Sequence, residues 1–260
     1  MTPHPPIASD HVHRSRHALA VVADIESFSG RDNREQMRTR QDLYEEVRTA
    51  FGASLWQSCY SEDRGDGLLV VVPHSAGAAH VIGEVLPALD RALSGRRRGD
   101  PLLRLRIAAH AGDVYADGEG IGGHAVNHAF RLCDAEPLRA ALKAARSDTA
   151  LLLSDSLYET IAHDGHPSVT PAAFHAVAVT VKETAARAWL HVPGDEAAAA
   201  GAAAAAPARG SEAATTEAAP PAQTGGVSFG SGNVTITRGA VAGRDIVRHS
   251  ARRRWWQRDG

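Results

Sequence analysis

The sequence has few cysteines, few aromatic residues and almost no lysine. Its two cysteines, Cys59 and Cys133, lie far apart, which argues against a disulfide scaffold or a zinc cluster. No apolar run approaches the roughly 20 residues that a membrane-spanning helix needs. Residues 1–17 are polar and lack the apolar segment of a signal peptide. These absences predict a cytoplasmic protein with reduced cysteines.

Charge and hydropathy set further bounds on the function. The formal net charge of −2 at pH 7 exerts no global attraction for nucleic acid or for an anionic membrane. The basic residues are almost all arginine, and the only lysines are Lys143 and Lys182. A hydrophobic content of 43% and a charged content of 22% are typical of a soluble globular protein. A chain of 260 residues has room for one domain with appendages.

The order of predicted elements indicates an α+β fold. Apolar and alternating runs predict strands over 17–25, 55–60, 68–73, 102–111, 150–153, 174–182 and 186–192. Amphipathic patterns predict helices over 33–51, 76–93 and 124–145, and a short helix that Ser154 or Asp155 caps. The first six elements follow the βαββαβ order of a ferredoxin-like fold, in which helices cover one face of the sheet.

Composition divides the chain into four segments. Residues 1–16 are expected to form a disordered N-terminal arm, and 17–195 the folded domain. Residues 196–225 are rich in alanine and interrupted by proline and glycine, which is typical of a flexible linker. Residues 226–260 combine Gly-punctuated β-like pieces with a basic end that carries two tryptophans. That flexible tail is a candidate contact for a protein partner, lipid or nucleic acid, and the alternative is a soluble, disordered end.

Acidic residues are concentrated in the turn 61–67, just before the apolar run 68–72. Three carboxylates lie within five positions, and glycines flank Asp66 on both sides. An Asp-Gly pair before a strand favours a tight hairpin turn. Such a turn can hold a carboxylate rigidly at a sheet edge, where it can bind a divalent cation. An ordinary solvated turn has the same composition.

Five short motifs occur in order between residues 17 and 192. They are Asp24-Ile25-x-x-Phe28, Gly65-Asp66, Arg106-Ile107-Ala108-Ala109-His110-Ala111-Gly112, Val126-Asn127-x-Ala129-x-Arg131 and Val181-Lys182-Glu183. Together they resemble the class III nucleotidyl cyclases, the adenylate/guanylate cyclase catalytic-domain family, in its soluble actinobacterial type. The resemblance implies an antiparallel-rich sheet around the βαββαβ core. Ala108 and Glu183 depart from it, because the family usually has glycine there.

The resemblance also implies roles for the matched residues. The implied metal ligands are Asp24, Ile25 and Asp66, the implied catalytic residues are Asn127 and Arg131, and the implied nucleotide-binding residues are Phe28, Glu62, Gly65 and Lys182. Two Mg²⁺ or Mn²⁺ ions per site, a nucleoside triphosphate substrate and a homodimer follow from the same resemblance. In the family, the metal carboxylates come from one subunit and the Asn, Arg and Lys from the other.

These roles predict an enzyme that makes a 3′,5′-cyclic nucleotide and pyrophosphate for intracellular signalling. Four residues before the second aspartate, the family carries lysine in adenylate cyclases and glutamate in guanylate cyclases, so Glu62 favours GTP. The second base-contacting position falls near 120–122, where the usual Asp or Cys is missing, and Asp63-Arg64 is a further departure. Two alternatives stay open: a weak or inactive nucleotide-binding regulatory module, and a pyrimidine nucleotide cyclase of a bacterial defence system.

Overall fold

The computed structural model of this chain describes residues 15–96, 103–116 and 120–206. Nearly all of the predicted N-terminal arm lies outside these ranges. The same holds for residues 207–225 of the predicted linker and for the whole segment 226–260. Most of the described residues therefore belong to the folded domain predicted over 17–195.

An eight-stranded sheet organises the described residues. Its strand order is β2-β3-β1-β4-β6-β8-β7, and the short β5 pairs with β4. Neighbouring strands are antiparallel except β4 and β6, which run parallel. The strands are β1 (Ser15–Ile25), β2 (Tyr60–Asp63), β3 (Gly67–Pro73), β4 (Leu105–Ala116), β5 (Ile121–Gly122), β6 (Thr149–Ser154), β7 (His175–Val181) and β8 (Thr184–His191). The predicted α+β class with a mostly antiparallel sheet is confirmed.

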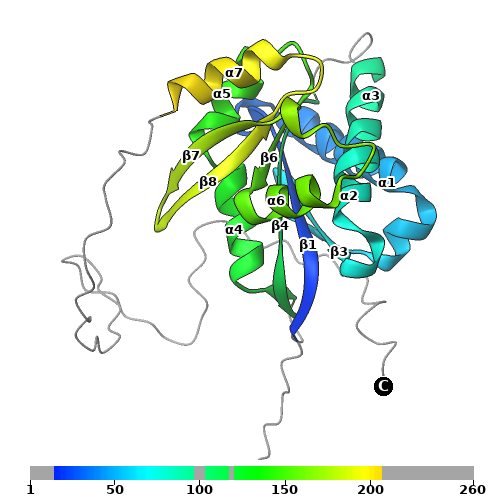
Figure 1. Cartoon of the computed structure of the whole chain (residues 1–260). Helices are drawn as coiled ribbons and strands as arrows, with labels where there is room; N and C mark the ends of the chain where they lie inside the picture. Colours follow the sequence, from blue (N-terminus) through cyan, green and yellow to red (C-terminus); the bar gives the residue numbers. More distant parts are fainter. Residues whose placement is uncertain (1–14, 97–102, 117–119, 207–260) are drawn as a thin grey trace, which may run out of the picture. The chain divides into compact units, whose positions relative to one another are not determined.

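Helices cover both faces of this sheet, so the expectation of helices on one face is wrong (Figure 1). One face carries α1 (Asn33–Ser58), α3 (Leu86–Arg96) and α6 (Asp155–Asp164), and the short α2 (Ala78–His80) and a π-helical turn over Val81–Val85 lead directly into α3. The other face carries α4 (His124–Cys133), α5 (Glu136–Ala144) and α7 (Glu196–Ala205). None of the helices in the described ranges is both long and apolar enough to cross a membrane.

The alternation of side chains along β1 determines which face the site occupies. Ala20 and Val22 pack with α4 and α5, whereas Leu19 and Val21 pack with α1 and α3. Because successive side chains in a strand point to opposite faces, Asp24 lies on the α4 side of the sheet.

Helix α1 is longer than its periodicity predicted. It continues beyond Phe51 through a kink at Gly52, where the backbone φ of +70° favours glycine, and ends at Ser58. The strand expected to begin at residue 55 therefore begins at Tyr60. Phe51 is 5% exposed and anchors the helix before the kink in the core beneath the sheet.

Residues 196–205 form helix α7, so the prediction of a linker is wrong for this stretch. Asp195 caps the helix, because its carboxylate accepts a hydrogen bond from the backbone N–H of Ala198 (3.2 Å). The same carboxylate accepts from the backbone N–H of Arg146 (3.0 Å), which ties the start of α7 to the segment after α5. Ala199 is fully buried, and α7 packs against α5 and β7. Alanine has high helix propensity and a small side chain, so a helix of low sequence variety still packs closely here.

Candidate functional site

The two aspartates of the predicted metal site lie close together along the backbone, Asp24 near the end of β1 and Asp66 in the turn just before β3. Asp24 lies opposite Gly67 in the pairing of β1 with β3, and the backbone N–H of Ile25 donates to the carbonyl oxygen of Asp66 at 2.9 Å. The chains approach so closely that a Cβ on Gly67 would lie 2.5 Å from the carbonyl oxygen of Ala23. A glycine at the first position of β3 is therefore required for this approach. The prediction that a strand end and a hairpin turn meet agrees with the geometry.

Gly65 makes the turn between β2 and β3. Its φ of +84° lies in the region that favours glycine, and its N–H donates to Asp63 Oδ1 at 2.7 Å. Asp63 is also paired with Arg40 of α1. Asp63 therefore has a structural role, because it stabilises the turn that carries Asp66.

Asp24 is paired with an arginine side chain in this structure. Its carboxylate forms an ion pair with Arg106, which lies directly opposite on β4, and the two side chains are 19% and 18% exposed. Burial lowers the pKa of Arg106. The sequence placed Arg106 in a motif but did not pair it with Asp24. The position of Arg106 within its predicted strand could have indicated this pair. Side chains alternate between the two faces of a strand, and Asp24 and Arg106 fall on the same face.

The donor set at this end of β1 and β3 fits a hard divalent cation. Magnesium is usually held by one or two carboxylates together with substrate phosphates, and manganese also prefers such oxygen ligands. Asp24 and Asp66 supply two carboxylates, and Ile25, which is 2% exposed, can contribute only its main-chain carbonyl. No group of three or more His, Cys, Asp or Glu residues suited to a metal occurs within the described ranges. Arg106 would have to leave Asp24 for a cation to bind.

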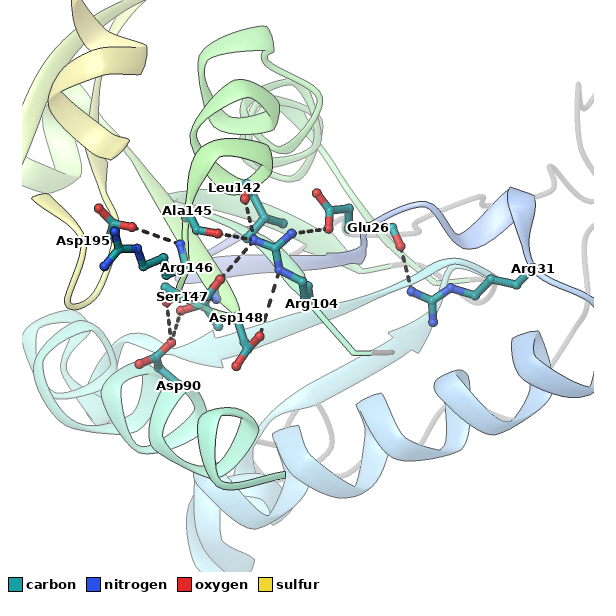
Figure 2. A network of polar contacts seen from close by, with 11 residues as sticks. Glu26, Arg31, Asp90, Arg104, Leu142, Ala145, Arg146, Ser147, Asp148 and Asp195 are labelled. Atoms are coloured by element: carbon teal, nitrogen blue, oxygen red, sulfur yellow. Dashed lines mark hydrogen bonds and ion pairs between the residues drawn. The ribbon is translucent and has the colours of Figure 1, made fainter. Parts of the chain in front are cut away.

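A polar network fixes the end of β1 beside this pair (Figure 2). Arg104 donates to Glu26 Oε2 at 2.7 Å and also reaches the carbonyl oxygens of Ala145 (2.9 Å) and Ser147 (3.1 Å). Arg31 donates to the carbonyl oxygen of Glu26 at 2.8 Å. The residue that follows Ile25 is thus held from two sides, and Arg104 ties it to the C-terminal end of α5.

Phe28 lies in the short 3-10 turn Phe28–Gly30 that follows β1. Its ring is partly buried against the core on the α1 side, and its carbonyl oxygen accepts from the N–H of Arg31 at 3.1 Å. The structure gives Phe28 an anchoring position, and its nucleotide-binding role stays a prediction.

Glu62 lies on β2 with both carboxylate oxygens engaged. The Tyr60 hydroxyl donates to Oε2 at 2.9 Å, and the Arg64 guanidinium lies 3.1 Å from Oε1. A Cβ on Gly120 would lie 3.8 Å from Glu62 Oε2. The two positions that the sequence associated with the base therefore lie together. Sequence reasoning did not find that Tyr60 and Arg64 complete this cluster, although it flagged Arg64 as a departure.

Asn127 and Arg131 share one face of α4, one turn apart. Arg131 donates from Nη1 to the Thr184 hydroxyl at 3.0 Å and from Nη2 to Glu183 Oε2 at 2.7 Å. Thr184 is 8% exposed, whereas the Glu183 side chain is 77% exposed. The guanidinium is thus held against the β7–β8 turn by one buried neutral group and one exposed acidic group.

Lys182 lies in a turn, and the prediction that it belongs to a strand is wrong. Lys182 and Glu183 form the two-residue connection between β7 and β8, in which Val181 pairs with Thr184. Lys182 is exposed and has a φ of +50°, which is uncommon for a residue with a side chain. The hairpin reversal displaces the lysine from the ladder, but it keeps Lys182 beside the residues that hold Arg131.

Three histidines cluster between β4 and α4. The His110 ring lies 4.6 Å from the His128 ring, which stacks at 6.1 Å on His124, and His110 Nδ1 is 2.8 Å from the Ser154 hydroxyl. Burial, followed by the neighbouring histidines, lowers the pKa of His110 from 6.5 to about 4. His110 is therefore neutral at pH 7.

Neither a protein-family model nor a curated protein sequence matches this chain. Solved structures do match it, and they define the fold class of the described residues as the adenylate/guanylate cyclase catalytic domain. This chain is similar to an adenylate/guanylate cyclase/hydrolase from Silicibacter pomeroyi, with 21% identity, a TM-score of 0.50, and coverage of 69% of this chain and 98% of that one. It also matches a guanylate cyclase domain from Catenaria anguillulae in complex with GTP, with 17% identity, a TM-score of 0.46, and coverage of 69% and 98%.

The first of these similarities confirms the predicted class III nucleotidyl cyclase fold. At this level of identity it shows the fold alone. The actinobacterial type and the roles of the individual residues stay predictions.

Proposed function

We propose that this protein is a nucleotidyl cyclase that converts a nucleoside triphosphate into a 3′,5′-cyclic nucleotide and pyrophosphate in cytoplasmic signalling. One observation carries the proposal: within a cyclase catalytic-domain fold, Asp24 near the end of β1 lies opposite Gly67, and Asp66, in the turn just before β3, accepts a backbone hydrogen bond from Ile25. An isolated acidic turn would have little functional meaning. Two carboxylates carried by neighbouring backbone segments at one end of the sheet suit a reaction that needs divalent cations beside phosphates.

Cyclisation forms a bond between the ribose 3′-oxygen and the α-phosphorus while the bond to pyrophosphate breaks. Two Mg²⁺ or Mn²⁺ ions, when bound, would lower the pKa of the 3′-hydroxyl and neutralise the triphosphate. Asp24 and Asp66 would hold them through their carboxylates, and Ile25 through its carbonyl oxygen. The surrounding hydrogen bonds of Glu26 keep this strand end in place.

The phosphate-binding side of the site is proposed to come from α4 and the β7–β8 turn. Arg131 would stabilise negative charge that develops on the α-phosphate, as positioned guanidinium groups do in phosphoryl transfer. Asn127 would act beside it in the transition state, and the exposed Lys182 would contact the outer phosphates. In the proposed homodimer, these three residues and the two aspartates of one complete site come from different subunits.

The base is proposed to bind at Glu62. A carboxylate can accept from both N1–H and the 2-amino group of guanine, and adenine offers no such pair of donors. Judged from the Glu62 carboxylate alone, GTP is the first substrate to test.

A nucleotide-binding module without turnover is the second candidate function. Two ion pairs favour it, because Asp24 is paired with Arg106 and Arg131 with Glu183. If these pairs persisted in the nucleotide complex, neither charge would be available for chemistry.

The test is to incubate purified protein separately with ATP, GTP, CTP and UTP in the presence of Mn²⁺ and to identify cyclic products by mass spectrometry. We expect a cyclic product from the wild type, and we expect Asp24→Asn and Asp66→Asn each to abolish it. Asp164→Asn, an exposed change at the end of α6, is the control and should keep activity. Nucleotide binding without any cyclic product would favour the binding module, and near wild-type activity in either site variant would contradict the metal role.

A further inference from the structure

Arg64 connects the residue proposed to read the base with helix α4. Its guanidinium lies 3.1 Å from Glu62 Oε1, and its Cζ lies 4.9 Å from the centre of the Phe130 ring. Phe130 directly precedes Arg131 in the sequence. An arginine over an aromatic face is attracted by the ring quadrupole, and the planar guanidinium keeps its N–H groups directed outward from its edge.

The turn that carries Arg64 is well ordered by its own hydrogen bonds. The N–H of Arg64 donates to the carbonyl oxygen of Gly67 at 2.9 Å, and Gly65 is fixed to Asp63. The Arg64 and Glu62 side chains are 37% and 30% exposed, so a ligand can reach both. Gly120 adds no side chain at the neighbouring position.

This arrangement changes what Glu62 offers to a base. A carboxylate without protein partners can accept hydrogen bonds from two adjacent donors. Among the four bases, guanine offers such a pair in N1–H and its 2-amino group. Here the Arg64 guanidinium covers Oε1, whereas the Tyr60 hydroxyl takes only one of the two lone pairs of Oε2 and leaves that oxygen able to accept from a base. The surface presented to a ligand is therefore a guanidinium donor beside a carboxylate acceptor.

We propose that Glu62 and Arg64 form a single base-reading pair, which accepts any base that has a donor next to an acceptor instead of selecting guanine. All four bases have such an edge, since guanine offers N1–H and O6, adenine the 6-amino group and N1, cytosine the 4-amino group and N3, and uracil N3–H and O4. The proposal rests on the proposed function, because it concerns the base pocket of the same site. Arg64 is the specificity-determining residue, and its removal uncovers the guanine preference of Glu62.

The experiment uses 3′-deoxynucleoside triphosphates, which lack the attacking hydroxyl and cannot cyclise. Binding of the guanosine, adenosine, cytidine and uridine forms to the full-length protein with Mg²⁺ is measured by calorimetry. The wild type should bind all four with affinities within about tenfold of one another. Arg64→Ala should shift the guanosine-to-uridine affinity ratio toward guanosine by about tenfold, the scale of a bidentate contact to a base edge. Because all four ligands carry the same triphosphate and metal, any effect of Arg64 on the neighbouring Asp66 cancels in this ratio.

Two further variants support this reading. Arg64→Gln removes the charge but keeps a polar side chain, so it should shift the ratio in the same direction and serves if the alanine variant fails to fold. Arg48→Ala removes an exposed arginine of α1 and should leave the ratio unchanged. A ratio that moves by less than twofold in both Arg64 variants overturns the proposal, as does a wild type that binds only the guanosine form or none of the four.

The proposed function fails separately. A wild type that binds the four ligands as described but makes no cyclic product from ordinary triphosphates would refute the cyclase activity and leave the base-reading pair intact.

Discussion

Two charges of the candidate site are paired with protein groups of very different exposure. The Arg131 partner Glu183 is 77% exposed, and ion pairs of that kind contribute little to stability. The triphosphate of the proposed reaction would therefore replace Glu183 at small cost, while the buried hydroxyl of Thr184 would continue to orient the guanidinium. The Asp24–Arg106 pair is more enclosed, so the cation proposed to bind there would have to offset a larger loss of interaction energy.

His110 predicts an acid-sensitive stability. Its pKa is about 4 in the folded protein, against 6.5 for the free side chain, because it is buried and faces His128, His124 and His17. Between these values the unfolded chain binds a proton that the folded protein does not. The free energy of unfolding should therefore fall as the pH is lowered from about 6.5 to about 4, by at most about 1.4 kcal/mol per pH unit for one proton.

Urea unfolding of the wild type and of His110→Asn between pH 4.5 and 7 measures this effect. The variant should lose part of the pH slope, whatever its stability at pH 7. His163→Gln removes a side chain that is 91% exposed and should keep the wild-type slope. Equal slopes in wild type and His110→Asn would show that His110 is not responsible.

Among the elements, α7 offers the clearest test of packing against composition. Gly201 lies within the helix on its exposed side, and a Cβ there would meet no atom within 4 Å. Gly201→Ala should therefore stabilise the protein by up to about 1 kcal/mol through helix propensity. Ala199 is fully buried, so Ala199→Glu should lower the thermal unfolding midpoint, since it buries a charge without a partner.

Differential scanning calorimetry of these two variants measures both effects. Glu196→Gln is the control, because it changes a largely exposed side chain of the same helix and should move the thermal unfolding midpoint little. Gly194→Ala would not serve, since the φ of +69° at Gly194 disfavours alanine. If Ala199→Glu unfolded at the wild-type temperature, residues 196–205 would behave as the linker that their composition suggested.

The elements that the sequence predicted well are those whose side chains repeat one pattern. The buried runs of β1 and β3 and the cap of α6 by Ser154 follow from local chemistry. The kink at Gly52 and the packing of α7 were missed because a glycine and an alanine run have the same local signature whether or not tertiary contacts exist.

The candidate site was predicted in a similarly uneven way. The meeting of Asp24 and Asp66 follows from a strand end and a hairpin. The contacts of Arg106, Arg64 and Thr184 depend on strand register and on helix docking, which a single sequence does not specify.

The whole molecule raises the question of how the two halves of the candidate site act together. Arg131 is held against the β7–β8 turn, and Asp24 is held by Arg106 on β4. In the proposed twofold homodimer, each complete site would take its carboxylates from one subunit and its Asn127, Arg131 and Lys182 from the other.

A subunit-mixing experiment tests this sharing. Asp24→Ala and Arg131→Ala homodimers should each be inactive, because every site carries one defect. A mixed dimer places both defects in one site and leaves the other intact. With random exchange half of the dimers are mixed and each has one good site of two, so roughly a quarter of wild-type activity should return. The measurement is cyclic nucleotide production after the two inactive proteins have been incubated together.

The matched control mixes Asp24→Ala with Asp66→Ala. Both changes lie on the carboxylate side of the site, so every site of the mixed dimer keeps one defect and no activity should return. Subunit exchange is followed independently with two differently labelled preparations. A mixture of Asp24→Ala and Arg131→Ala that exchanges subunits but stays inactive would refute the shared site. If the site is shared, each mixed dimer must contain one site without any defect.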